Sequence, residues 1–128
     1  MLSSRRTGGG VKVLIADDDR LVRTIVSDLL EELGHAVVAA SNGAEAVDLA
    51  AREAPDVLIL DLLMPKMSGL DALHALRARG VGAPAVLLTA ISDGSFRAME
   101  GADAIDVRLE KPVTRRSLER ALARAVRR

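Results

Sequence analysis

The chain alternates between short, mostly apolar runs and longer segments with helical periodicity, and this alternation is the strongest constraint on its fold. Each apolar run has five or six residues, as expected for a strand buried on both faces of a parallel sheet. The runs are residues 11–16, 35–40, 56–60, 84–89 and 105–109. The sequence therefore predicts five strands, each followed by a helix.

The segments after the runs repeat apolar residues with the period of a helix. In residues 20–33 these side chains recur at intervals of three and four, as on a helix that buries one stripe. Asp19, Ser68 and Thr114 precede their segments as predicted N-caps. The predicted helices are residues 20–33, 41–53, 68–79, 92–100 and 114–126. The fourth is weak, and Gly101 cuts it short.

Strands that alternate with helices form a parallel sheet covered on both faces. Right-handed crossovers then leave a doubly wound α/β sheet as the natural closure at a length of 128 residues. We expect residues 1–10, which end in three glycines, to be a flexible extension. Residues 11–128 are expected to form one domain.

Composition narrows the class of protein. Hydrophobic residues make up 49% of the chain, too many for a disordered protein, yet no run is long enough to predict a membrane helix or a secretory signal. There is no cysteine for disulfides or thiolate metal sites, and a single aromatic residue, Phe96, cannot build a base-stacking platform. We therefore expect a cytoplasmic protein.

Charge is unevenly distributed, although the formal net charge is zero. Residues 1–10 carry +2, residues 11–110 carry −8, and residues 111–128 carry +6. The basic last segment is interpreted first as a solvated helix face. A docking surface for an acidic partner comes second, and nucleic-acid binding is a distant third.

Polar side chains follow four of the predicted strands. Asp17 and Asp18 follow the first strand, Asp61 the third, Thr89 ends the fourth, and Lys111 follows the fifth. Parallel strands bring such residues to one edge of the sheet. Carboxylates without histidine or cysteine suit Mg²⁺ or Mn²⁺, and lysine binds phosphate. The set favours phosphoryl transfer, with a carboxylate able to act as nucleophile.

Four motifs in this order carry a family resemblance. They are VLIADDD at the first strand, LILDLLMPKMSG around Asp61, LLTA at the fourth strand and EKPV at Lys111. Over residues 11–127 the sequence resembles a response-regulator receiver domain of the CheY-like type. That resemblance implies a flavodoxin-like, five-stranded parallel sheet in the order 2-1-3-4-5, with helices on both faces.

The resemblance also implies a role for each matching position. Asp61 corresponds to the phosphoacceptor and contributes to the metal site. Asp18 corresponds to the direct Mg²⁺ ligand, Asp17 to a ligand that acts through water, and Leu63 to the position whose backbone carbonyl binds the metal.

Three further positions follow from the same resemblance. Thr89 corresponds to the hydroxyl that contacts the phosphoryl group, and Lys111 to the lysine that pairs with it, with the Lys111–Pro112 bond in cis. Arg108 departs from the family, because receivers usually carry an aromatic switch residue there.

The sequence thus predicts a stand-alone, single-domain response regulator. Its expected partners are a histidine kinase or phosphotransfer protein, which would phosphorylate Asp61, and a downstream protein target; a homodimer is possible, and no DNA-binding domain or membrane contact is expected. It would not be an enzyme, except toward its own phosphorylation and dephosphorylation.

Two alternatives stay open. One is a docking module that works without phosphorylation, which Arg108 mildly favours. The other is a metal-dependent phosphohydrolase that uses Asp61. Such enzymes usually place a second aspartate two residues after the nucleophile, where this chain has Leu63.

Overall fold

The computed structural model describes residues 10–90 and 107–126. The strands are β1 (Lys12–Ala16), β2 (Ala36–Ala40), β3 (Val57–Asp61), β4 (Ala85–Thr89) and β5 (Val107–Glu110). The helices are α1 (Arg20–Glu32), α2 (Gly43–Glu53), α3 (Gly69–Ala78) and α4 (Arg115–Val126). The predicted helix at 92–100 lies outside the described residues, as do Phe96 and the extension at 1–9.

The five strands form one parallel sheet in the order β2-β1-β3-β4-β5, as predicted. Register places Ala16 of β1 beside Ala40 of β2 and Leu60 of β3, and Asp61 beside Leu88 of β4. All residues of β3 and β4 are buried. Apart from Asp61 and Thr89 at their carboxyl ends, these strands are apolar, as a position in the middle of a covered sheet requires.

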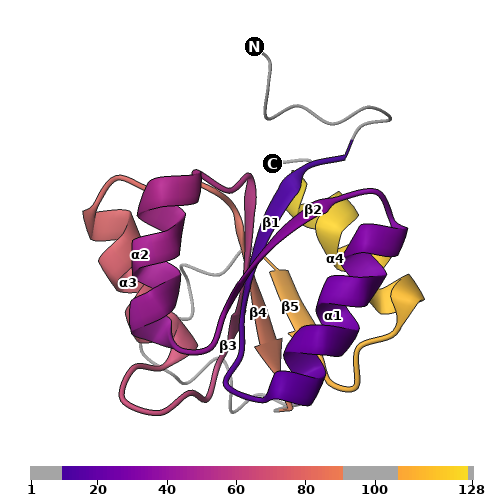
Figure 1. The fold of residues 1–128 in the computed structure, drawn as a ribbon, viewed down its shortest axis with the longest axis horizontal. Helices are drawn as coiled ribbons and strands as arrows, with labels where there is room; N and C mark the ends of the chain where they lie inside the picture. Colours follow the sequence, from indigo (N-terminus) through magenta and orange to yellow (C-terminus); the bar gives the residue numbers. More distant parts are fainter. Residues whose placement is uncertain (1–9, 91–106, 127–128) are drawn as a thin grey trace.

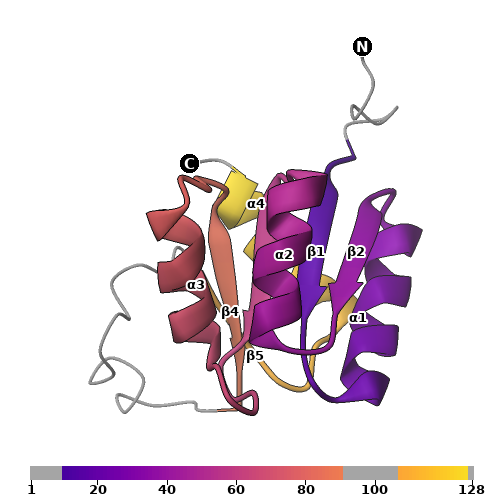
Figure 2. The same ribbon diagram turned by 60° about the vertical axis from the view of Figure 1, so that its left-hand side comes forward.

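Helices cover both faces of the sheet. Figure 1 shows α2 and α3 on one side and α1 and α4 on the other, and Figure 2 shows the same layers from a second direction. Alternate residues of each strand point to opposite faces, so the sheet divides the apolar interior into two cores. One core packs β1 residues Val13 and Ile15 under α1 and α4, and the other packs Leu14 and Ala16 under α2 and α3.

The element ends differ by one or two residues from the predicted ranges. β3 begins at Val57 and includes Asp61, because Asp61 continues the ladder with β4. β2 begins at Ala36, since the N–H of His35 bonds back to the carbonyl of Leu30 in the preceding turn. β5 is described from Val107 and runs to Glu110, while residues 105 and 106 of the predicted strand lie outside the described part.

The predicted caps of the first and third helices are confirmed. The Asp19 side chain accepts hydrogen bonds from the N–H groups of Leu21 and Val22 at the start of α1. Ser68 and Asp71 form a reciprocal capping box at the start of α3. These caps satisfy backbone donors that have no partner within the helix, and so fix where each helix leaves the sheet edge.

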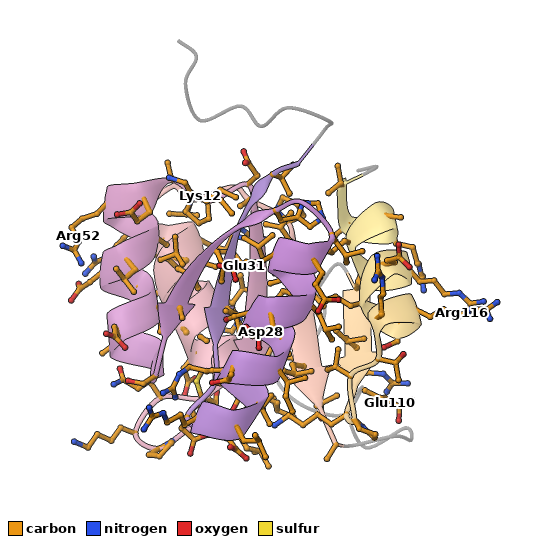
Figure 3. All side chains as sticks on the ribbon, turned by 45° about the vertical axis from the view of Figure 1, so that its right-hand side comes forward. Lys12, Asp28, Glu31, Arg52, Glu110 and Arg116 are labelled. Atoms are coloured by element: carbon orange, nitrogen blue, oxygen red, sulfur yellow. The ribbon has the colours of Figure 1, made fainter. Side chains whose placement is uncertain are left out.

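The surface charges of α1 and α4 differ in sign. Asp28 and Glu31 project from α1, and Arg116 projects from α4 (Figure 3). Arg115 of α4 pairs with Glu32 of α1 at 3.6 Å, but both side chains are more than half exposed, so this pair contributes little stability. In the described part of the chain no helix is long and apolar enough to cross a membrane.

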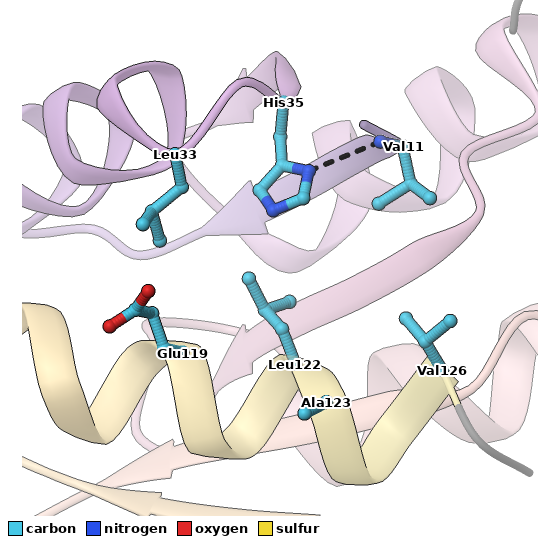
Figure 4. A pocket seen from close by; sticks show the side chains of 7 residues that line it. All are labelled: Val11, Leu33, His35, Glu119, Leu122, Ala123 and Val126. Atoms are coloured by element: carbon cyan, nitrogen blue, oxygen red, sulfur yellow. Dashed lines mark hydrogen bonds between the residues drawn. The ribbon is translucent and has the colours of Figure 1, made fainter. Parts of the chain in front are cut away.

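A pocket of about 300 Å³ lies between α4 and the end of the sheet where the strands begin (Figure 4). Leu33, His35, Glu119 and Leu122 are among the residues that line it. The His35 Nδ1 accepts a hydrogen bond of 3.1 Å from the backbone N–H of Val11. The acceptor role requires Nδ1 to be unprotonated.

Acid should weaken the fold through His35. Burial lowers the pKa of His35 below its ordinary value of 6.5, and protonation of Nδ1 would also break its bond to Val11. For a base whose folded pKa is lowered, the stability is complete above the unfolded pKa and is lost as pH falls below it. As pH falls from about 7 to about 5, the contribution of His35 to the free energy of unfolding should therefore fall.

The variant His35→Asn keeps an acceptor near the position of Nδ1 but does not titrate. Denaturant unfolding should show a smaller loss of stability for this variant than for the wild type over the same pH range. Equal losses would assign the effect to other groups.

Candidate functional site

The carboxyl ends of the strands bring together five side chains that are distant in sequence. Asp17 and Asp18 follow β1, Asp61 ends the neighbouring strand β3, Thr89 ends β4, and Lys111 follows β5. Carboxylate oxygens of the three aspartates lie within 4.8 Å of one another. The sheet order explains this, because β1 and β3 are adjacent and Ala16 pairs with Leu60, so that Asp17 and Asp61 each follow directly after a paired residue.

Lys111 forms ion pairs with two of the carboxylates. Its Nζ lies 3.2 Å from Oδ2 of Asp17 and 3.3 Å from Oδ1 of Asp61. The Lys111 side chain is 26% exposed, whereas Asp17 is fully buried and Asp61 is 4% exposed. One cation therefore faces two buried anions, with the exposed Asp18 as a third beside them.

This imbalance changes the acidity of the site. Burial, reinforced by the charge of Asp17, raises the pKa of Asp61 to about 6, although Lys111 opposes the shift. Burial disfavours the charged form of Lys111, but the charges of Asp61 and Asp17 outweigh it and raise the pKa of Lys111. The carboxylates are thus short of positive charge at neutral pH.

The donor set fits a hard divalent cation. Oδ1 of Asp17 accepts the N–H of Asp19 at 2.8 Å, but within the described residues its buried Oδ2 accepts no well-directed hydrogen bond despite the nearby Lys111. A buried carboxylate oxygen without a hydrogen bond is costly, and a metal ion would satisfy it. Oxygen ligands from three aspartates are the type that Mg²⁺ and Mn²⁺ prefer.

The other predicted positions lie around this cluster. Thr89 is buried, and its carbonyl accepts the N–H of Lys111 at 2.9 Å. Leu63 lies two residues beyond Asp61 with its side chain 66% exposed. The Lys111–Pro112 peptide bond is cis, as expected. Arg108 is exposed on β5 and lines a groove with Arg120 and Arg124 of α4.

Residues 13–123 match the model of the response regulator receiver domain. The chain belongs to this family. It is 43% identical over 86 residues to the probable transcriptional regulatory protein TcrX of Mycobacterium tuberculosis. The aligned region covers 67% of this chain and 37% of TcrX. It is 41% identical over 115 residues to the response regulator MprA of Mycobacterium bovis. The aligned region covers 89% of this chain and 48% of MprA. The chain thus spans less than half the length of these curated relatives.

Solved structures show the same receiver fold. The chemotaxis protein CheY4 of Vibrio cholerae superposes with a TM-score of 0.85 at 31% identity, covering 91% of this chain and 99% of that one. A response regulator receiver domain protein of Clostridium thermocellum superposes with a TM-score of 0.81 at 29% identity. The superposition covers 91% of this chain and 94% of that one. The family and the fold expected from the four motifs are therefore confirmed.

Sequence reasoning missed two residues that shape the site of this receiver domain. Arg23 on α1 reaches back to the carbonyl of Asp17, and Gly69 at the start of α3 lies against the backbone of Asp61. Ser68 predicted the start of the third helix, but nothing in the Ser68–Gly69 pair indicates a close approach to β3. Nothing in the spacing of Arg23 indicates its partner, because Arg20 on the same helix has the same side chain and is exposed.

Gly69 has no room for a side chain. A Cβ there would overlap the carbonyl oxygen of Asp61 and come within 3.0 Å of its carbonyl carbon. The N–H of Gly69 also bonds to the carbonyl of Leu62 at 3.0 Å, so α3 cannot move away without losing this contact. The absence of a side chain at Gly69 allows α3 to pack against the end of β3.

We expect Gly69→Ala to lower the free energy of unfolding by about 2 kcal/mol, because the overlap is with backbone rather than with a flexible side chain. Denaturant unfolding measures this. Gly82→Ala is the matched control, since a Cβ at Gly82 has no neighbour within 4 Å. Equal stability of the two variants would contradict the close packing of α3 on β3.

Proposed function

We propose that this receiver domain accepts a phosphoryl group on Asp61 from a histidine kinase or phosphotransfer protein in a Mg²⁺-dependent reaction. The observation that carries the proposal is the buried Asp61 carboxylate between a second buried carboxylate, Asp17, and the ammonium group of Lys111. This arrangement supplies a nucleophile, a metal-binding set and a compact cation at one point.

In the proposed reaction an Asp61 carboxylate oxygen attacks the phosphorus of a phosphohistidine. A phosphorus–oxygen bond forms as the phosphorus–nitrogen bond of the donor breaks. The electron pair of the broken bond leaves with the imidazole, which takes a proton from water. With a pKa of about 6, Asp61 is mostly ionised at neutral pH and is available as a nucleophile without a separate general base.

Asp17, Asp18 and Asp61 would hold the metal, with the backbone carbonyl of Leu63 as a further ligand. Bound Mg²⁺ would neutralise the negative charge that carboxylates and phosphoryl oxygens bring together. Lys111 would pair with the phosphoryl group once Asp61 carries it, and the Thr89 hydroxyl would bond to one of its oxygens. Beyond its own phosphorylation and dephosphorylation, we propose no enzymatic turnover.

The phosphorylated domain would signal by binding another protein. Two of its relatives bear the names of a transcriptional regulatory protein and a response regulator. The output of this chain, whether through a separate protein target or a homodimer, depends on surfaces other than the phosphorylation site. The exposed Arg108 lies on one such surface together with α4.

Incubation with a small acyl phosphate tests the proposal. Intact-mass spectrometry should show the addition of one phosphoryl group in the presence of Mg²⁺ and none when the metal is chelated. A chain that stays unmodified, although it folds, would support the docking-module alternative. Continuous release of phosphate with many turnovers would support the phosphohydrolase alternative.

A further inference from the structure

Asp18 is the least constrained member of the carboxylate cluster. It is exposed, and within residues 10–90 and 107–126 no hydrogen bond or ion pair holds its side chain. Asp17, in contrast, is fully buried and bonded through Oδ1 to the N–H of Asp19. The direction of the Asp18 carboxylate therefore depends on how the backbone of the β1–α1 turn is held.

Arg23 holds that turn from the first turns of α1. Its Nη1 donates a hydrogen bond of 2.8 Å to the carbonyl oxygen of Asp17, and its backbone N–H bonds to the carbonyl of Asp19 at 3.0 Å. Because the peptide bond is planar, fixing the carbonyl of Asp17 also fixes the N–H and Cα of Asp18. One side chain thus sets the peptide plane from which Asp18 projects.

The guanidinium of Arg23 binds a backbone carbonyl and is not neutralised by a directly paired carboxylate in the described residues. In the described part of the chain Arg23 forms no salt bridge. Hydrogen bonds from Ser41 are the main reason that the pKa of Glu45 in α2 is lowered, and the charge of Arg23 makes a smaller contribution in the same direction. Glu45 is itself fixed by hydrogen bonds from the N–H and hydroxyl of Ser41 at 2.6 and 2.9 Å. The hydrogen bond to the Asp17 carbonyl is thus the contact that holds the Arg23 guanidinium.

We propose that Arg23 is a positioning residue for the metal site: by holding the carbonyl of Asp17 it orients the Asp18 carboxylate toward Asp17 and Asp61. The inference rests on the proposed function, since it concerns Mg²⁺ binding at that cluster. Outer-shell hydrogen bonds of this kind orient the ligands themselves, and their loss typically weakens metal binding by about 10–100-fold.

A positioning role and a purely electrostatic role of Arg23 predict changes of opposite sign in the Mg²⁺ affinity. If Arg23 acted only through its charge, its removal would strengthen the binding of a cation at the nearby carboxylates. If it positions Asp18, its removal weakens that binding. The sign of the change in Mg²⁺ affinity therefore separates the two explanations.

The experiment compares wild type, Arg23→Met, Arg23→Lys and Arg20→Met by Mg²⁺ titration, followed through backbone amide chemical shifts. Arg20 is a matched control, because it is exposed at the start of the same helix and carries the same charge. We expect Arg23→Met to bind Mg²⁺ about 10-fold more weakly, and Arg20→Met to bind as tightly as wild type or more tightly. Arg23→Lys keeps the charge but not the planar guanidinium donor, so its affinity should lie between wild type and Arg23→Met.

Amide hydrogen exchange in metal-free protein provides a second measurement. The amides of Asp18 and Asp19 should exchange faster in Arg23→Met than in Arg20→Met at equal global stability.

Unchanged or tighter Mg²⁺ binding by Arg23→Met, with a wild type that binds, would overturn this inference alone. A wild type that does not bind Mg²⁺ would overturn the proposed function and this inference together. If Arg23→Met does not fold, weaker binding by Arg23→Lys supports the inference and unchanged binding overturns it.

Discussion

Asp61→Asn should abolish phosphoryl uptake from an acyl phosphate, with no detectable labelled protein under conditions that label the wild type. The asparagine amide is a poor nucleophile, and no other carboxylate can take its place. Asp17 is fully buried against Lys111, and Asp18 lies on the exposed side of the cluster. Intact-mass spectrometry measures the loss, and persistent labelling would contradict the assignment of Asp61.

The same substitution should stabilise the metal-free protein above pH 6. Because the folded-state pKa of Asp61 is raised, the folded protein binds its proton more tightly than the unfolded chain does. The wild type therefore loses stability as pH rises from about 4 to about 6, and Asp61→Asn escapes this loss.

We expect a gain on the order of 1–3 kcal/mol at pH 8 that shrinks toward zero near pH 4. Unfolding curves at both pH values measure it. Asp48→Asn, which removes an exposed charge on α2, serves as the control and should change stability little. A gain that does not depend on pH would argue against ionised Asp61 as its source.

Of the substitutions proposed here, Lys111→Met should lower the free energy of unfolding most at pH 8. The substitution keeps most of the apolar stem but removes the ion pairs with Asp17 and Asp61, which leaves two buried carboxylates unopposed. Removing one partner of a buried ion pair typically costs about 3 kcal/mol or more. At pH 5 the cost should be smaller, because Asp61 can take up a proton.

Unfolding of Lys111→Met at pH 8 and pH 5 tests this, with Lys66→Met as a control at an exposed lysine. The double variant Lys111→Met, Asp61→Asn adds a second test. In the Asp61→Asn background Lys111→Met should lower the free energy of unfolding by less, because only one of the two buried carboxylates is left unpaired. Additive losses would show that Lys111 and Asp61 do not interact.

The sheet and the cluster were predictable because each depends on a local pattern. VLIL at residues 57–60 is a short apolar run typical of a buried strand, and the residue that ends such a strand lies at the carboxyl edge of the sheet. The convergence of Asp17, Asp61 and Lys111 then follows from the sheet order. Their distances, and the unequal burial of Asp17 and Asp18, depend on packing that no pattern encodes.

The residues that shape the turns around the site were not predictable. The contact of Arg23 with the Asp17 carbonyl depends on the angle at which α1 leaves the sheet. The fit of Gly69 under the Asp61 carbonyl depends on how closely α3 approaches β3. Both contacts are made to a backbone carbonyl at the end of a strand, whereas sequence periodicity reports only which face of an element is buried.

The strand order has a consequence for synthesis of the chain on the ribosome. β1 is the first strand to be made, yet it lies inside the sheet between β2 and β3. At translation rates of about 5–20 residues per second, the apolar edge of β1 that pairs with β3 stays open for a few seconds after β2 is complete. Fragments that end before residue 57 keep that edge exposed and lack the Asp61 carboxylate, so they combine a high tendency to aggregate with an incomplete metal site.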